Sequence, residues 1–297
     1  MSPRQVAGDR RLIRVPASIG NLGPGFDTIG LALALYLRVT IRRRIEDGQG
    51  RLVAHFGAER PVAQNGIARA FAHWPFRVAR PPSFEVDVAS DIPERAGLGS
   101  SAAAAVAGLR LRGLCDGART AGELVAAAAA LEGHPDNAAA VVLGGLTGSR
   151  VAEDGTVTVT RWPWPRAWTI VVATPYVQLA TKEARRVLPL RVPLKDAVFN
   201  LQRVSLLLHA VHTRNAEEMG EALQDRLHQP YREPLVPVLA RALDLRHPDI
   251  IGACLSGAGP SVAFVARRRP AAVERALVSL YRKEGVPCTV RALRVHQ

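Results

Sequence analysis

The sequence predicts an α+β fold in two lobes, and three observations support this. Two segments in the first third of the chain alternate apolar and polar residues with the two-residue period of a half-buried strand. Alanine-rich segments with helix-start signals follow them. The composition then changes over residues 149–168, where an acidic turn, the strand-like TVTVT and a Pro–Trp cluster occur together. We therefore expect two domains, residues 1–155 and 156–297.

The strands of the first lobe are predicted from alternation. Residues 35–41, LYLRVTI, place four aliphatic side chains on one face of a strand and Tyr36, Arg38 and Thr40 on the other. Residues 84–88, FEVDV, repeat the pattern with Phe and Val on the inner face. The two segments together predict an antiparallel sheet with one solvated face.

The helices of the first lobe are predicted from their start signals. Residues 100–112 are rich in Ala and Leu and begin with Ser, a residue favoured at helix N-termini. Residues 120–131 begin with Thr120, and Glu123 follows at the spacing of a capping box. Residues 137–143 form a third, short helical segment that ends at a Gly–Gly pair.

The second lobe is predicted to mix strands and helices. Its candidate elements are strands at 169–174, 261–266 and 288–295 and amphipathic helices at 196–209 and 215–227. No internal repeat and no low-complexity tract occurs in the sequence.

The composition is that of an ordinary globular chain. Its 297 residues are 48% apolar, and no window approaches the ~18 consecutive apolar residues that span a bilayer. Cys115, Cys254 and Cys288 lie far apart and lack metal-ligand spacing. The chain starts with a polar, basic segment that no apolar stretch follows. We therefore expect a cytoplasmic protein with no membrane partner, no disulfide framework and no structural zinc site.

The net charge of +13 allows two interpretations. Lysine occurs only three times, so nearly all the basic residues are arginine. A basic surface can gather nucleic-acid backbones. These arginines, however, are dispersed, and no basic tail, aromatic–basic interleaving or nucleic-acid module is present. We therefore expect no nucleic-acid partner and attribute the charge to a bias towards arginine, with at most an anionic small-molecule substrate.

Three glycine-bearing turns stand out, and the second carries the clearest chemistry. In this second glycine turn, residues 93–101 (PERAGLGSS), two glycines let the backbone approach a ligand just before a helix. The first-turn amides of that helix lack partners within it, and the helix dipole favours an anion there. The spacing is neither a Walker loop nor GxGxxG. A phosphate cradle and a serine-capped helix both remain open on this pattern alone.

Two further turns and one polar segment offer candidate site residues. The first glycine turn, residues 15–27, has three glycines and a proline within six positions, and Asn21 and Asp27 flank them. The third glycine turn, residues 255–261 (LSGAGPS), precedes an apolar strand. Residues 132–137 (EGHPDN) crowd four side chains that can bind metal, accept protons or hold a substrate. The alternative is that these are simple turns, with the Asp and Asn of EGHPDN capping the next helix.

Taken in order, these motifs resemble those of the GHMP kinase family, named for galacto-, homoserine, mevalonate and phosphomevalonate kinases. The family's PxxxGLGSSA motif is matched by Pro93 to Ala102, and its SGAGP-like turn by Ser256 to Pro260. Within the family the resemblance is closest to the homoserine kinases. Their VPASxxNLGPGFDxxGLAL, EGHPDN, TKEARxxLP and PYRxxLxP motifs are matched in that order.

The resemblance implies a fold and a reaction. The fold has an N-terminal lobe like ribosomal protein S5 domain 2 and a ferredoxin-like C-terminal lobe, with the active site between them. The reaction transfers a phosphoryl group from ATP to the side-chain hydroxyl of L-homoserine, with Mg²⁺, in threonine biosynthesis. A homodimer is common in the family. The alternatives are another small-molecule kinase of the family, of the mevalonate or shikimate type, and an RNA-associated S5-like protein.

The resemblance also implies how ATP is bound. The phosphates lie on the second glycine turn, and Mg²⁺ is held by Glu132 and Ser101, with Ser100 as the alternative hydroxyl. Asn65 matches an asparagine near the nucleotide base. The residues implied to bind ATP are Pro93, Gly97, Leu98, Gly99, Ser100, Ser101 and Asn65.

Homoserine is a zwitterion, so its site needs both signs of charge. Arg185 and Arg232 match the family's arginines for the carboxylate, and Asp27 suits the ammonium group. The substrate-binding residues implied are Asn21, Asp27, His134, Asn137, Thr181, Arg185, Arg232 and Gly257. The catalytic residues implied are Asp136, Glu132 and Ser101. Asp136 matches the family's candidate base, and the alternative is that the substrate loses its proton to the phosphate.

Overall fold

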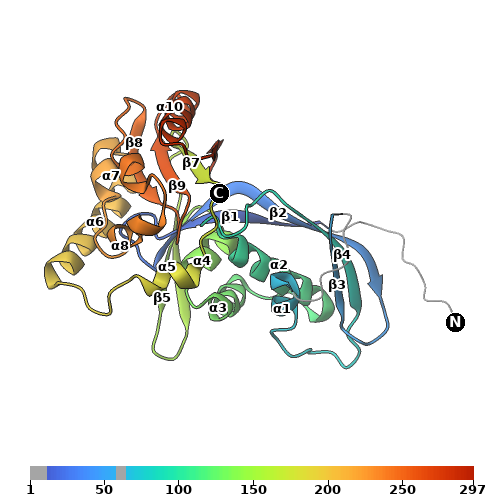
Figure 1. Ribbon diagram of the computed structural model, residues 1–297. Helices are drawn as coiled ribbons and strands as arrows, with labels where there is room; N and C mark the ends of the chain where they lie inside the picture. The colour runs from blue at the N-terminus through green and yellow to red at the C-terminus, as the bar shows by residue number, and fades with distance from the viewer. Residues whose placement is uncertain (1–11, 58–64) are drawn as a thin grey trace.

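Two β-sheets, each covered by helices, organise the chain (Figure 1). The computed structural model describes residues 12–57 and 65–297. The polar, basic segment at the start of the chain, residues 1–11, therefore lies outside the described residues. The mixed α and β content and the two sheets agree with the α+β, two-lobed fold predicted from the sequence.

The first sheet has the strand order β3-β4-β2-β5-β6, and β1 pairs with β2 off this path. Its strands are β1 (Leu12–Gly20), β2 (Ile29–Ile45), β3 (Leu52–Phe56), β4 (Ser83–Ser90), β5 (Leu146–Val151) and β6 (Val157–Trp162). The two strands predicted from alternation are confirmed as parts of β2 and β4. These two strands pair antiparallel, and the side chains predicted to face inward on β4 are buried. The predicted TVTVT strand lies mostly in β6.

Four helices lie in the described part of the first lobe, and α2 and α4 contact β1 and β2. The helices are α1 (Gly66–Phe71), α2 (Ser100–Asp116), α3 (Ala121–Glu132) and α4 (Asp136–Leu143). The capping box of Thr120 and Glu123 at the start of α3 is confirmed, with both of its hydrogen bonds present. Most of the apolar side chains of α2 are buried, because they fill the space between the sheet and α1.

Two predicted helix caps are wrong. The N-cap of α2 is Gly99 in a left-handed conformation, so the serines that follow lie inside the helix and do not cap it. The N-cap of α4 is Pro135, so Asp136 and Asn137 occupy the first turn and make no capping hydrogen bond. Their side chains are thereby left for the pocket that the helix start faces.

The second sheet is antiparallel, with the order β10-β7-β9-β8. Its strands are β7 (Thr169–Pro175), β8 (Ile250–Leu255), β9 (Val262–Ala266) and β10 (Cys288–Leu293). The three strands predicted for this lobe are confirmed as β7, β9 and β10, whereas β8 was not predicted.

The helical segments of this lobe are α5 (Thr181–Arg186), α6 (Leu194–Thr213), α7 (Ala216–Ala222), α8 (Gln229–Arg232), η1 (Glu233–Leu235), α9 (Leu239–Leu243) and α10 (Pro270–Lys283). The predicted helix at 196–209 lies within α6. The helix predicted over 215–227 is too long, because α7 ends at Ala222. Asp225 instead accepts the backbone N–H groups of Leu227, His228 and Gln229, and this starts α8.

The end of the chain returns to the first sheet and joins the two lobes. Leu33 forms a β-bridge with Val295, and the N–H of Gly145 donates to the carbonyl of His296 at 2.7 Å. Residue 155 lies in the turn between β5 and β6, which pair with each other in the first sheet. The division into domains at that residue stays a prediction, and the first sheet itself ends at Trp162. None of the helices over residues 12–57 and 65–297 has the length and apolarity to cross a membrane.

Two glycines in helices provide a matched test of the packing in the first lobe. A Cβ on Gly108 of α2 would lie 2.2 Å from the carbonyl oxygen of Ile67, whereas a Cβ on Gly122 of α3 would meet nothing within 4 Å. We expect Gly108→Ala to lower the free energy of unfolding by about 1–3 kcal/mol, despite the better helix propensity of alanine. Gly122→Ala should cause no loss. Urea unfolding of the two variants checks this, and equal stabilities would contradict the packing of α1 on α2.

Candidate active site

One pocket between the lobes gathers residues from all three glycine turns and from residues 132–137. Its lining includes all the predicted site residues except Pro93, Leu98 and Asn65. The residues it brings together are Asn21, Asp27, Gly97, Gly99, Ser100, Ser101, Glu132, His134, Asp136, Asn137, Thr181, Arg185, Arg232 and Gly257. Segments separated by more than 200 residues therefore share one cavity wall.

Hydrogen bonds to backbone carbonyl groups hold the three glycine turns against one another. The N–H of Gly257, in the third turn, donates to the carbonyl of Gly20 in the first turn at 3.1 Å. The hydroxyl of Ser256 donates to the carbonyl of Gly97 in the second turn at 2.7 Å. The N–H of Ser18 donates to the carbonyl of Leu98 at 3.1 Å. Each turn is thus bonded to both of the others.

The glycines of the second turn are required by this close contact. Gly97 and Gly99 have φ angles of 75° and 69°, in the left-handed region that favours glycine. A Cβ on Gly97 would lie 2.3 Å from the carbonyl oxygen of Ser256, and a Cβ on Gly99 would lie 2.1 Å from Oγ of Ser18. Any side chain at either position would push the second turn away from its neighbours.

The start of α2 has the properties of an anion cradle. Its N-cap, Gly99, makes no side-chain capping bond, and no acidic residue lies in the first turn. The backbone N–H groups of the first turn have no carbonyl partner within the helix, and the helix dipole adds a partial positive charge. Gly99, Ser100, Ser101 and Ala102 all line the pocket. The arrangement suits a phosphate group.

A hydroxyl and a carboxylate lie beside this cradle. Oγ of Ser101 donates to Oε1 of Glu132 at 2.8 Å. Two neighbouring ligands of an octahedral Mg²⁺ with bonds of ~2.1 Å lie about 3 Å apart, so this pair has the spacing and the oxygen chemistry that Mg²⁺ prefers. The donor set therefore fits the metal that the sequence predicted for these two residues.

Opposite charges face each other on the other side of the pocket. Arg185 of α5 donates to both carboxylate oxygens of Asp27, at 2.9 and 2.6 Å. Both side chains are about one-third exposed, so the pair is accessible to solvent. The sequence predicted these residues for opposite ends of a zwitterion, and the structure places them in direct contact.

A second arginine, Arg232, is held rigidly at the wall of the pocket. Its Nε donates to the carbonyl of Ala184 at 3.1 Å, and its Nη1 donates to the carbonyl of Gly257 at 2.9 Å. Burial, together with the positive charge of Arg185, lowers the pKa of Arg232 to about 10. The guanidinium carbons of both arginines lie 5.5 Å from the ring centre of Phe26.

A chain of hydrogen bonds runs through the first residues of α4. Oδ1 of Asp136 accepts from Nδ1 of His134 at 2.6 Å and from Nδ2 of Asn137 at 3.2 Å. Oδ1 of Asn137 in turn accepts from the hydroxyl of Ser18 at 2.8 Å. Burial by itself lowers the pKa of His134, but the hydrogen bond and charge of Asp136 and the charge of Asp27 outweigh it, so the pKa is raised above its usual value.

Comparison with known proteins gives this geometry a family. Residues 63–145 match the family model described as the GHMP kinases N terminal domain, and residues 207–283 match that of the GHMP kinases C terminal. The homoserine kinase of Moorella thermoacetica is 41% identical over 291 residues, covering 95% of this chain and 96% of that protein. The homoserine kinase of Solibacter usitatus is 38% identical, covering 92% and 90%.

The chain belongs to the GHMP kinase family. It is therefore an enzyme, a kinase, and ATP is its phosphoryl donor. The crystal structure of a homoserine kinase from Cytophaga hutchinsonii has the same fold, with a TM-score of 0.84 at 22% identity over 100% of this chain and 98% of that one. A putative homoserine kinase from Listeria monocytogenes gives a TM-score of 0.75 at 29% identity, covering 96% of each chain. The mevalonate kinase of Methanococcus jannaschii shares the fold at 14% identity, with a TM-score of 0.66, covering 98% of this chain and 100% of that one.

Three residues that were predicted to bind ATP do not line the pocket between the lobes. Pro93 and Leu98 line a neighbouring apolar pocket between the second glycine turn and strands β7 and β10. Asn65 is the N-cap of α1, where its side chain accepts the N–H of Ala68 at 2.9 Å. Their roles towards the nucleotide stay predictions.

The structure also adds residues that the sequence analysis missed. Arg95 lines the pocket within the second glycine turn, and its φ of 50° is unusual for a residue other than glycine. Phe26 and Ser18 contact predicted site residues directly. Phe26 and Ser18 lie within the first glycine turn, so this motif could have identified them as site residues. Arg95 could not be singled out among so many dispersed arginines.

The raised pKa of His134 predicts a pH-dependent contribution to stability. A group whose pKa is higher in the folded state stabilises that state fully below its ordinary pKa of 6.5, and the contribution is lost as the pH rises through the folded value. We expect His134→Gln to lower the free energy of unfolding by about 1–3 kcal/mol near pH 5.5 and by less near pH 9. Urea unfolding at both pH values checks this, with His73→Gln on the surface as the control. A loss that does not change with pH would contradict it.

Proposed function

We propose that this enzyme transfers the γ-phosphoryl group of ATP to the side-chain hydroxyl of L-homoserine and forms O-phospho-L-homoserine. The observation that carries the proposal is the ion pair of Arg185 and Asp27, which faces Arg232 in the same pocket as the anion cradle of α2. A zwitterionic amino acid needs both signs of charge, and a phosphoryl donor needs the cradle. The homoserine kinases that match nearly the whole chain support the same substrate.

The accessible ion pair suits exchange with the substrate. A partly exposed pair of this kind contributes only about 0–1 kcal/mol to stability, so its opening costs little. The carboxylate of homoserine would accept from Arg185 and Arg232, and its ammonium group would donate to Asp27. Asn21, which donates to the carbonyl of Gly257 at 3.0 Å, closes this end of the pocket. Binding of the substrate would thereby replace the ion pair of Arg185 and Asp27 with two ion pairs, one at the substrate carboxylate and one at its ammonium group.

The triphosphate would lie on the second glycine turn, with the N–H groups of Gly97 to Ser101 as donors. Ser101 and Glu132 would hold Mg²⁺, which would neutralise charge on the transferred phosphate. The protein's own contribution is to fix the two substrates in line, because phosphoryl transfer depends mainly on positioning and on charge stabilisation. Arg95 adds a further cationic side chain to this part of the wall.

The reaction breaks the bond between the γ-phosphorus and the oxygen that bridges to ADP and forms a bond from the homoserine oxygen to phosphorus. The hydroxyl proton must leave at the same time. Asp136 lines the pocket and is the candidate acceptor, with His134 and Asn137 orienting its carboxylate through Oδ1. The alternative acceptor is the phosphate itself.

The setting of the reaction follows from the same proposal. We place the enzyme in the cytoplasm, the compartment that its odd number of widely spaced cysteines favours. Its product would serve threonine biosynthesis. A homodimer, which is common in the family, is part of the same proposal.

A substrate panel tests the function directly. ATP turnover is measured by coupled ADP release with homoserine, mevalonate, shikimate or galactose as acceptor. We expect kcat/KM for homoserine to exceed that for the other acceptors by on the order of 100-fold or more, because only an amino acid satisfies both charges in the pocket. Removal of divalent cations by a chelator should abolish the turnover. A higher kcat/KM for another acceptor would contradict the assignment of homoserine as the substrate. Salt-sensitive RNA binding without ATP turnover would favour the RNA-associated alternative.

The role of Asp136 is tested by Asp136→Asn, which keeps the shape of the side chain and removes the base. If Asp136 accepts the proton, kcat for homoserine should fall by about 10²–10⁴-fold while KM changes much less. A thermal melt of the variant controls for folding. A kcat close to that of the wild type would contradict this role and favour the phosphate as the acceptor of the hydroxyl proton.

A further inference from the structure

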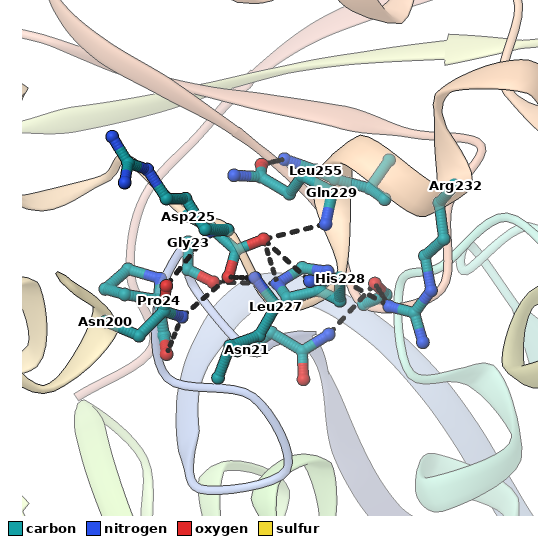
Figure 2. A network of polar contacts seen from close by, with 12 residues as sticks. Asn21, Gly23, Pro24, Asn200, Asp225, Leu227, His228, Gln229, Arg232 and Leu255 are labelled. Atoms are coloured by element: carbon teal, nitrogen blue, oxygen red, sulfur yellow. Dashed lines mark hydrogen bonds and ion pairs between the residues drawn. The ribbon is translucent and has the colours of Figure 1, made fainter. Parts of the chain in front are cut away.

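A buried network next to the substrate pocket has no assigned role in the reaction (Figure 2). It joins α6, the loop before α8, α8 itself and the first glycine turn. The carboxylate of Asp225 lies at its centre and accepts from Nδ2 of Asn200 at 2.7 Å, in addition to three backbone N–H groups. Asn200 also donates to the carbonyl of Pro24 in the first turn at 3.0 Å. The network therefore fixes where α8 begins.

His228 is the N-cap residue immediately before α8 and is fully buried. Its Nε2 lies 2.7 Å from the carbonyl oxygen of Gly23, and its Nδ1 lies 3.2 Å from Nη1 of Arg232. A carbonyl can only accept and a guanidinium can only donate. Both contacts are satisfied together by one form of the ring, the neutral tautomer with its proton on Nε2.

The surroundings of the ring maintain this neutral form. Burial lowers the pKa of His228, and the nearby charge of Asp225 only partly offsets it. The ring stacks on Phe26, with centroids 5.5 Å apart. Phe26 also lies next to both substrate arginines. A protonated ring would turn a donor towards Arg232 and repel its charge.

We propose that His228 is a positioning residue that orients the guanidinium of Arg232 for the substrate and ties it to the first glycine turn. Nη1 of Arg232 is held by His228 on one side and by the carbonyl of Gly257 on the other. The neighbouring residue, Gln229, accepts the N–H of Leu255 through Oε1 at 2.7 Å, so the same helix is also anchored to β8. This role rests on the proposed function, because it concerns the arginine that would bind the substrate carboxylate.

Two substitutions separate the two hydrogen bonds of the ring. In His228→Asn the amide oxygen can stand near the position of Nδ1 and still accept from Arg232, while the donor to Gly23 is lost. In His228→Gln the amide nitrogen can stand near the position of Nε2 and still donate to Gly23, while the acceptor for Arg232 is lost. A purely structural role for His228 predicts similar effects from both substitutions.

The test compares steady-state kinetics of the two variants with those of the wild type. We expect His228→Gln to raise KM for homoserine about tenfold or more, with KM for ATP within about twofold, and His228→Asn to raise it much less. Equal effects of the two variants, or equal effects on both substrates, would overturn the proposal. Absence of homoserine turnover by the wild type would overturn the function itself, whereas normal wild-type turnover with an unchanged KM in His228→Gln would overturn only the role of His228.

Nitrogen NMR of the wild-type enzyme with ¹⁵N-labelled histidine gives a readout that needs no folded variant. We expect one histidine to remain the neutral Nε2–H tautomer throughout the pH range in which the protein is folded. Its Nδ1 resonance should shift when homoserine binds and stay unchanged when ATP alone binds. The proposal would be overturned if every histidine ring became protonated as the pH is lowered, or if the Nδ1 resonance of the neutral ring did not respond to homoserine.

Discussion

The structure depends on the meeting of three glycine turns backbone to backbone, with Gly257 at the junction. The N–H of Gly257 donates to the carbonyl of Gly20, and its own carbonyl accepts from Nδ2 of Asn21 and from Nη1 of Arg232. The backbone of one residue thus joins the first lobe, the second lobe and a substrate arginine. Side chains at Gly97 or Gly99 would separate the turns, because a Cβ at either position would lie within 2.5 Å of a neighbouring oxygen.

This junction fixes the positions of two different binding regions in one pocket, one for an anion and one for a zwitterion. The free N–H groups at the start of α2 face the pocket on one side, and the charges of Asp27 and Arg185 face it on the other. Two of the chain's many arginines, Arg185 and Arg232, line this pocket, and the guanidinium carbon of each lies 5.5 Å from the ring centre of Phe26. The partly exposed ion pair adds little to stability, so we expect its main role to be in binding.

Local patterns made the alternating strands within β2 and β4 and the capping box of α3 predictable, because each depends on neighbours in sequence. The first strand was not predicted, because Val15 to Gly20 are all buried and show no alternation. The end of α7 could not be predicted either, since it depends on Asp225 capturing the N–H groups of the next turn. Most site residues were found through motifs, whereas the pairing of Arg185 with Asp27 and the contacts of His228 join residues 158 and 205 positions apart.

The most direct test is a crystal structure with homoserine and a non-hydrolysable ATP analogue bound together. The geometry requires the phosphates on the N–H groups of Gly97 to Ser101. It also requires the homoserine carboxylate between Arg185 and Arg232, with the ammonium group on Asp27. Phosphates bound away from the second glycine turn, or homoserine outside the pocket that the three turns form, would contradict the assignment of this junction as the active site.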